Sequence, residues 1–296
     1  MTNVITAAMV KELREITSAG MMECKKALEA SGGNIETAIE ELRKSGIAKA
    51  GKKAGRVAAE GAVVIAISDD KKQGVMVEIN SETDFVSRDE NFTTFAKIVG
   101  DVALESKVED VAALAAAKSA GSDQTVEDIR LALVTKVGEN VQIRRLQRTS
   151  ANAGYVGSYI HGVRIGVVVE LDVENEELAR DVAMHIAAAR PIVISPDKVP
   201  QDLVDKEKEI FTAQAATSGK PAEIIEKMVV GRMKKFLDEV SLTGQPFVKD
   251  PEQSVGTLLA KHKAKVLAFH RYEVGEGIEK VVEDFKEAVM SQAQGS

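Results

Sequence analysis

The sequence has little of several residue types, and each shortage excludes something. Its 296 residues include one cysteine, no tryptophan and only 4% aromatic residues. A lone cysteine cannot form an internal disulfide, which is typical of proteins from a reducing compartment. Because aromatic residues are scarce, we expect cores of Ala, Val, Leu and Ile and slim, closely packed helices.

Long apolar runs and a signal segment are also missing. No stretch approaches the roughly 18 apolar residues of a membrane span, and the first residues lack a basic region followed by an apolar run. The net charge of -7 argues against bulk binding to nucleic acid or to a membrane surface. We therefore expect a soluble, cytoplasmic protein with no membrane partner.

Motifs for catalysis are absent from the sequence. No Ser, Cys or Thr stands in a recognisable nucleophile setting, and no Cys and His pair has metal-ligand spacing. Residues 46–53 approach a phosphate-binding loop, but Lys53 occupies the position where Ser or Thr must hold magnesium, and a helix precedes the loop instead of a strand. The sequence predicts no catalytic residue, metal, cofactor or nucleotide site, and it favours a protein that binds another macromolecule.

Residues 1–55 predict a domain of three short helices. Thr6 is expected to cap the first helix, the second spans residues 21–30, and the third spans residues 34–46. A bundle of this size has a thin core and few chemical groups, so docking is a more plausible role than catalysis.

Three side chains and one segment of this region carry specific expectations. Cys24 lies beside apolar residues and is expected to fill the core. Met21 and Met22 point in different directions on a helix, so at least one should be open to a partner. The basic segment from Lys44 to Arg56 is interpreted as a solvated linker or as a contact with RNA or an acidic partner.

From residue 61 onward the chain repeats one order of elements. A β-hairpin is followed by an Ala-rich helix, and later a helix leads into a third strand. The core is therefore expected to consist of two related α+β halves, each with a three-stranded antiparallel sheet and helices on one face. The expected halves are residues 56–150 and residues 151–199 with 241–277.

An insertion interrupts the second half. Residues 201–217 and 222–240 predict two helices with an apolar seam, so the inserted segment 200–240 is expected to be a protruding antiparallel coiled-coil hairpin. Self-association is expected to use either this hairpin or the core. A last amphipathic helix is expected from residue 278 to 290, within a C-terminal module of residues 278–296.

The stretch from residue 80 to 89 links a predicted strand to a predicted helix. Ser87 and Glu90 have capping-box spacing, so the helix is expected to begin at Ser87. This leaves Asp84 and Phe85 on the turn. The ring of Phe85 either folds back as a staple on the following helix or stands out as a probe for a partner's pocket.

The four histidines carry separate expectations. His185 and His270 are most simply structural, and His262 lies on a helix. His161 is placed at a hairpin tip beside Gly162, so it is a candidate for contact with a partner.

Several motifs in this order resemble the bacterial elongation factor Ts family. They are Val10 to Arg14 with Ala19 to Leu28, Thr83 to Val86, Gly138 to Asn140, His161 to Gly166 and Ser241 to Phe247. The match covers essentially the whole chain. The Ala-rich segment 102–125 looks expanded relative to the family.

The resemblance implies a guanine-nucleotide exchange factor without covalent chemistry of its own. Its partner would be the GTPase elongation factor Tu, and the N-terminal bundle would be a ubiquitin-associated-like docking domain. In the family, the pair matching Asp84 and Phe85 intrudes beside the magnesium and phosphate site. The partner-binding residues implied are Arg14, Met21, Met22, Lys25, Thr83, Asp84, Phe85, Val86, Val137, Gly138, His161 and Val248.

A second hypothesis belongs to another class. An RNA-associated or general adaptor protein could use the basic segment and the small bundle, and its binding to RNA would depend strongly on salt.

Overall fold

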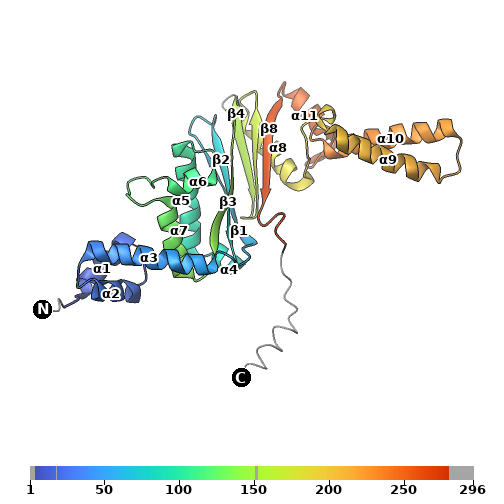
Figure 1. The fold of residues 1–296 in the computed structure, drawn as a ribbon. Helices are drawn as coiled ribbons and strands as arrows, with labels where there is room; N and C mark the ends of the chain where they lie inside the picture. The colour runs from blue at the N-terminus through green and yellow to red at the C-terminus, as the bar shows by residue number, and fades with distance from the viewer. Residues whose placement is uncertain (1–3, 18, 151–152, 280–296) are drawn as a thin grey trace, which may run out of the picture. The chain divides into compact units, whose positions relative to one another are not determined.

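The computed structural model describes residues 4–17, 19–150 and 153–279 (Figure 1). Helices and small sheets make up these residues, so the predicted α+β class is confirmed. The chain divides into two compact units. We call them unit 1, with Met1–Val64, Val77–Leu146 and Glu273–Ser296, and unit 2, with Ile65–Met76 and Gln147–Tyr272.

Unit 1 begins with three helices, α1 (Ala7–Thr17), α2 (Met21–Ala30) and α3 (Ile35–Lys53). The Thr6 hydroxyl accepts a hydrogen bond from the Met9 N–H at 3.3 Å, as the sequence predicts for an N-cap. Between them the helices bury a small apolar core, made of Val10, Leu13, Cys24, Ala27, Leu28 and Ala38.

The predicted end of the third helix is wrong. Helix α3 continues past Gly46 to Lys53, so most of the basic segment expected as a linker is helical. Gly46 is buried beside Leu131 and Thr135 of α7 (Val126–Val137). A glycine inside a helix costs about 1 kcal/mol relative to alanine, and the packing of α3 against α7 offsets that cost.

The first sheet has the strand order β1-β2-β3, with β1 at Glu60–Ile67, β2 at Gly74–Ser81 and β3 at Val141–Arg148. Its middle strand, β2, is buried along its whole length. Figure 1 shows α5 (Glu90–Ser106), α6 (Val111–Ala116) and α7 together on one side of this sheet. The hairpin and the third strand therefore form where the sequence predicts them.

The helix expected to begin at Ser87 is in fact two helices, α4 (Asp84–Ser87) and α5 (Glu90–Ser106). Thr83 caps α4, and Asp89 caps α5. The capping box predicted from Ser87 is therefore wrong, because the Asp89 carboxylate caps the longer helix and Ser87 closes the shorter one.

A buried carboxylate in β2 holds the segment after β8 (Val266–Glu273). Glu78 is fully buried and accepts hydrogen bonds from Arg144 at 3.0 Å, from Arg145 at 2.5 Å and from the Gly275 N–H at 2.8 Å. Arg144 and Arg145 also donate to backbone carbonyls of Glu276 and Glu273, respectively. One acid thus joins two neighbouring arginines and the chain beyond β8.

Unit 2 contains the second sheet, of order β4-β5-β8, with β4 at Tyr155–His161 and β5 at Ile165–Leu171. These two strands are antiparallel, with a register running from Tyr155 opposite Leu171 to His161 opposite Ile165. Helix α8 (Glu176–Ala189) packs on the hairpin. Gly157 allows this approach, since a Cβ there would lie 2.4 Å from the Ala179 Cβ.

The remaining elements of unit 2 complete the repeat. Helix α11 (Val255–Lys261) leads into β8 just as α7 leads into β3, so the predicted repetition of element order is confirmed. The shorter elements are η1 (Pro196–Lys198), β6 (Pro246–Phe247), β7 (Asp250–Ser254) and α11 (Val255–Lys261).

A helical hairpin lies between η1 and β6. Its helices, α9 (Gln201–Ala216) and α10 (Ala222–Val240), match the predicted limits closely. Phe211 and Phe236 meet edge to face with ring centroids 6.4 Å apart. The buried part of the seam consists of Ala215, Val229 and Met233.

Two predicted regions remain. In the Ala-rich segment 102–125, α5 ends at Ser106 and α6 (Val111–Ala116) follows. The predicted last helix, residues 278–290, lies outside the described residues from 280 on. In the part of the chain that the structure describes, no helix is both long and apolar enough to cross a membrane.

Candidate functional site

Phe85 projects from the short helix α4, directly after the middle strand of the first sheet. Its side chain is 83% exposed. By contrast, Phe92 and Phe95 of α5 are buried. The hypothesis that Phe85 staples onto α5 is therefore wrong, and the ring stands in solvent.

The residues around Phe85 hold α4 firmly. Thr83 donates to the Glu139 carboxylate twice, from its backbone N–H at 3.0 Å and from its hydroxyl at 2.7 Å. The Ser81 hydroxyl donates to the Thr83 carbonyl at 2.9 Å, and the Ser87 hydroxyl donates to the Asp84 carbonyl at 2.9 Å. An exposed ring is thus mounted on a backbone that is tied down on both sides.

Asp84 lies beside Phe85 with about half of its side chain exposed. Its carboxylate pairs with Arg88 at 3.0 Å, and the Arg88 side chain is itself 76% exposed. An ion pair this accessible contributes little to stability. The Asp84 carboxylate therefore remains available to a cation or a partner that approaches α4.

The turn after α7 lies against the same motif. Gly138 ends α7 with φ of 79°, a conformation that favours glycine. Beyond it, the Asn140 N–H donates to Glu82 at 2.6 Å, and Arg56 pairs with Glu82 at 3.5 Å. Glu139 and Asn140, which directly follow Val137 and Gly138, are thus bonded to Thr83 and Glu82, and Val86 of the same motif is buried.

Glu139 and Glu82 are the residues of this site that the sequence analysis missed. Both act by holding backbone, since Glu139 accepts from Thr83 and Glu82 accepts from Asn140. One signal could have found Glu139, because an acid directly after a helix-ending glycine is well placed to accept from a neighbouring turn.

A second exposed patch lies on the N-terminal bundle. Arg14, Met21, Met22 and Lys25 line one hollow of its surface. Met21 is 60% exposed and Met22 is 64% exposed, so both are open to a partner. Cys24 is part of the buried core, and burial raises the pKa of its thiol. Its predicted role as core filler is confirmed.

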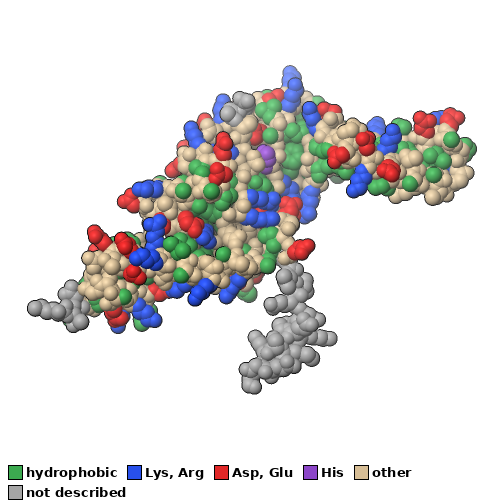
Figure 2. All heavy atoms as spheres, viewed as in Figure 1, with side chains coloured by type: hydrophobic (Ala, Val, Ile, Leu, Met, Phe, Trp, Pro, Cys, Tyr) green, Lys and Arg blue, Asp and Glu red, His purple; other side chains and the backbone are tan. Residues whose placement is uncertain are grey.

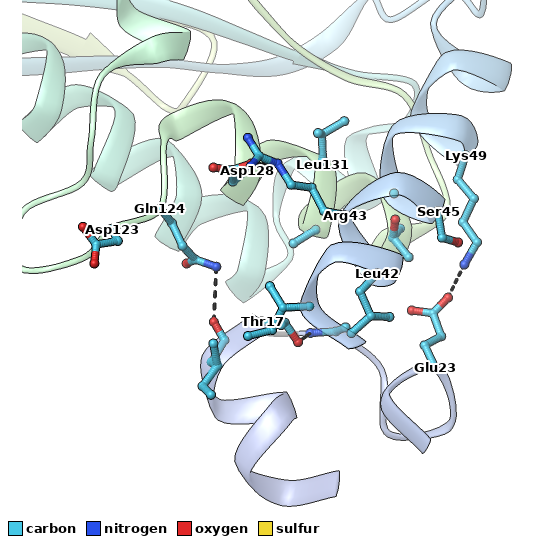
Figure 3. A pocket seen from close by; sticks show the side chains of 16 residues that line it. Thr17, Glu23, Leu42, Arg43, Ser45, Lys49, Asp123, Gln124, Asp128 and Leu131 are labelled. Carbon is cyan, nitrogen blue, oxygen red and sulfur yellow. Dashed lines mark hydrogen bonds and ion pairs between the residues drawn. The ribbon is translucent and has the colours of Figure 1, made fainter. Parts of the chain in front are cut away.

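A cavity of about 310 Å³ lies where this bundle meets α7 (Figure 3). Ion pairs and hydrogen bonds cross it: Lys49 pairs with Glu23, and Gln124 donates to the Ile16 carbonyl at 3.2 Å. Arg43 also pairs with Asp128 of α7 at 2.9 Å. The contacts of Gln124 and Asp128 join the bundle to the rest of unit 1, and Lys49 is paired within the bundle, so the interpretation of residues 44–56 as a solvated linker is wrong.

Three of the five basic side chains of that segment pair with acids. Lys44 pairs with Glu40 and Glu41, Lys49 with Glu23, and Arg56 with Glu82. Paired cations attract a phosphate backbone less than free ones do, which weakens the argument for RNA binding here.

His161 and Val248 belong to unit 2 and occupy different loops. His161 is exposed at the end of β4, where Gly162 turns the chain with φ of 60°, and its Nδ1 lies 3.3 Å from the Tyr159 hydroxyl. Val248 is 46% exposed in the loop after β6. Burial lowers the pKa of both His185 and His270, which agrees with their predicted structural roles.

The α9–α10 hairpin presents a mixed surface. Figure 2 shows charged side chains of both signs along it, with apolar side chains between them. Ile224 is 45% exposed and Val230 is 64% exposed. Exposed apolar side chains on a narrow helix pair are candidates for contact with another chain.

Comparison with known proteins agrees with this arrangement. A family model described as "Elongation factor TS" matches residues 82–276. A protein named elongation factor Ts from Thioalkalivibrio sulfidiphilus is 61% identical over 293 residues, covering 99% of both chains. Proteins of the same name from Legionella pneumophila and Coxiella burnetii are each 57% identical, over 290 residues (98% of this chain and 99% of the relative) and 293 residues (99% of both), respectively.

Proposed function

Because this chain belongs to the elongation factor Ts family, we propose that it is a translation elongation factor that binds elongation factor Tu and accelerates the exchange of GDP for GTP. The observation that carries this proposal is the exposed ring of Phe85 on its tethered helix. A large, rigid side chain held in solvent by buried neighbours has the properties of a binding anchor.

The proposed mechanism is displacement at the partner's nucleotide site. Magnesium and the backbone that cradles the phosphates supply much of the affinity of a GTPase for its nucleotide. Phe85 would enter a pocket beside that site, while the Asp84 carboxylate would compete for charge near the magnesium ion. Displacing the partner's magnesium ion or its phosphate-binding backbone would weaken GDP binding and speed GDP release.

Thermodynamic linkage makes this an exchange reaction that needs no covalent chemistry. A factor that binds the nucleotide-free GTPase best must weaken nucleotide binding by the same ratio. The factor itself then requires no nucleotide site, cofactor or metal. GTP rebinding displaces the factor and completes the cycle.

Several further contacts would share the binding energy. The ubiquitin-associated-like bundle would dock through Arg14, Met21, Met22 and Lys25, and His161 and Val248 would add contacts from unit 2. When binding patches belong to one chain, engagement of one raises the effective concentration of the others at the partner. Several individually weak patches can therefore give high overall affinity. Thr83, Val86, Val137 and Gly138 complete the proposed partner-binding set.

The proposed domains follow from these roles. They are a docking domain at 1–55, core halves at 56–150 and at 151–199 with 241–277, a coiled-coil hairpin at 200–240, and a C-terminal module at 278–296. We propose that the hairpin mediates self-association through its exposed apolar side chains. We propose a cytoplasmic location, which agrees with the family's role in translation.

A direct test loads elongation factor Tu with a fluorescent GDP analogue and times its release after addition of this protein and excess GDP. The expected result is release that accelerates with the concentration of the factor and then saturates. Release at the uncatalysed rate would contradict exchange, and strongly salt-dependent binding to RNA in its place would favour the adaptor hypothesis.

A further inference from the structure

The loop after α10 leads from buried side chains to the exposed side chain of Val248. Gln245 is 7% exposed and Phe247 is 4% exposed, whereas Val248 is 46% exposed. The direction in which Val248 points therefore depends on how the backbone of this loop is held.

His185 of α8 is the group that holds it. The imidazole is 1% exposed, and its Nδ1 accepts a hydrogen bond from the Val248 N–H at 3.2 Å. Because Nδ1 is an acceptor, the proton lies on Nε2, which donates to the Gln245 side-chain oxygen at 2.9 Å. One neutral imidazole ring thus hydrogen-bonds to both ends of the segment from Gln245 to Val248.

The rest of this loop is tied to the same surroundings. The Gln245 amide donates to the Glu239 carbonyl at 2.7 Å, which leaves its oxygen facing His185. On the other side of Val248, Lys249 pairs with Asp181 of α8 at 2.5 Å. Val248 therefore stands between two attachments to α8, and only the one at His185 is buried.

We propose that His185 is a positioning residue that sets the contact made by Val248 with the GTPase. This inference rests on the proposed function, because Val248 is a contact only if the chain binds elongation factor Tu. His185 itself would touch no partner atom. It would act by fixing the Val248 backbone in the free protein. Binding would then not have to pay the entropy cost of ordering this loop.

A matched pair of variants separates the two nitrogens of the ring. His185→Asn places an oxygen near the position of Nδ1 and can still accept from the Val248 N–H. His185→Gln places its amide near the position of Nε2 and loses that acceptor. We expect the Gln variant to raise the factor concentration for half-maximal GDP release at least about fivefold, as loss of one hydrogen bond allows, and the Asn variant to stay near the wild type.

The test adds Val248→Ala to both backgrounds, with concentrations corrected for folded protein by thermal melting. If His185 acts through Val248, His185→Gln changes half-saturation in the wild-type background and has no further effect once Val248 is alanine. Additive effects, or equal behaviour of the Asn and Gln variants, would overturn the positioning role. If His185→Gln does not fold, His185→Met takes its place, because it also lacks the acceptor. If His185→Met then reaches half-maximal GDP release at the same factor concentration as the wild type, the proposal is overturned.

The design also distinguishes failure of the inference from failure of the proposed function. If Val248→Ala leaves half-saturation unchanged while the wild type accelerates release, the positioning role falls and exchange stands. If the wild type fails to accelerate release at all, the proposed function falls first.

Discussion

Glu139 accepts two hydrogen bonds from Thr83, one from the backbone N–H and one from the hydroxyl. These two residues are far apart in sequence, and the pair joins the turn after α7 to the start of α4. Phe85 follows two residues later. The carboxylate of Glu139 therefore fixes the base from which the exposed ring projects.

The first prediction follows from that pair. Glu139→Ala removes both acceptors and leaves the Thr83 donors without their partner, which costs about 1 to 3 kcal/mol of stability. We expect GDP release to slow by more than the loss of folded protein explains, because α4 is no longer fixed. Melting and release measured on one preparation check this. GDP release at the wild-type rate per folded molecule would show that the hydrogen bonds between Glu139 and Thr83 are not needed to position α4.

The second prediction contrasts two phenylalanines. Phe85→Ala should leave the melting temperature nearly unchanged, since the ring is exposed, and it should slow GDP release by upward of about 2 kcal/mol in activation free energy. Phe92→Ala should do the reverse, because truncating a buried Phe costs about 3 to 5 kcal/mol of stability. Asp84→Asn should slow release more mildly than Phe85→Ala. If Phe85→Ala releases GDP at the wild-type rate, Phe85 is not a binding anchor in exchange.

The third prediction concerns the bundle surface. Replacing Met21 and Met22 together with glutamine should weaken the complex with elongation factor Tu and leave melting unchanged, since both side chains are exposed. Ile47→Gln is the matched control, because Ile47 is also exposed, at 53%, and lies outside the proposed contacts. Titration calorimetry checks both. Equal weakening by the control would point to a general surface effect.

The fourth prediction is a pH dependence at Glu78. Burial alone would raise the pKa of this carboxyl, but hydrogen bonds from Gly275, Arg144 and Arg145 outweigh it and hold the pKa below its ordinary value of 4.5. A carboxyl whose pKa is lower in the folded state contributes stability above its unfolded pKa and loses it as pH falls through the folded pKa.

The stability advantage of the wild type over Glu78→Gln should therefore be full at pH 7 and should shrink below about pH 4.5. Denaturant unfolding of both proteins across that range measures it. An advantage that stays constant down to acid pH would mean that the Glu78 charge is not what stabilises the arginine pair.

The fifth prediction concerns the α9–α10 hairpin. The backbone on either side of it pairs directly, since the Ile192 N–H donates to the Val240 carbonyl at 2.9 Å and the Leu242 N–H donates to the Val193 carbonyl at 2.9 Å. Replacing residues 201–239 with a short flexible linker should therefore leave a folded core. Sedimentation should show reduced self-association. A variant that fails to fold would mean that the hairpin stabilises unit 2.

The parts of the fold that could be predicted are those set by local pattern. The hairpins, the repeated element order and the limits of α9 and α10 follow from alternation, apolar periodicity and turn residues. Two predictions failed, one because a contact distant in sequence decided it and one because a neighbouring residue supplied the cap. Gly46 continues a helix because α7 covers it, and Ser87 does not cap α5 because Asp89 does.

The candidate site shows the same division. Phe85 could be singled out from the sequence, but its exposure could not be decided until the buried positions of Phe92 and Phe95 were known. Glu139 was missed because its role exists only when the turn after α7 meets the start of α4. Pairings of this kind leave no periodic signal in the chain.

The continuation of α3 through Gly46 makes that helix a rod between two proposed contacts. Its 19 residues span about 28 Å at 1.5 Å per residue. One end belongs to the bundle, and just past the other end the carbonyl of Arg56 accepts a hydrogen bond from Asn140, at the turn that holds Thr83. Because α3 is continuous and packs on α7, it sets a fixed spacing between the bundle surface and the base of Phe85, where a flexible tether would leave that spacing variable.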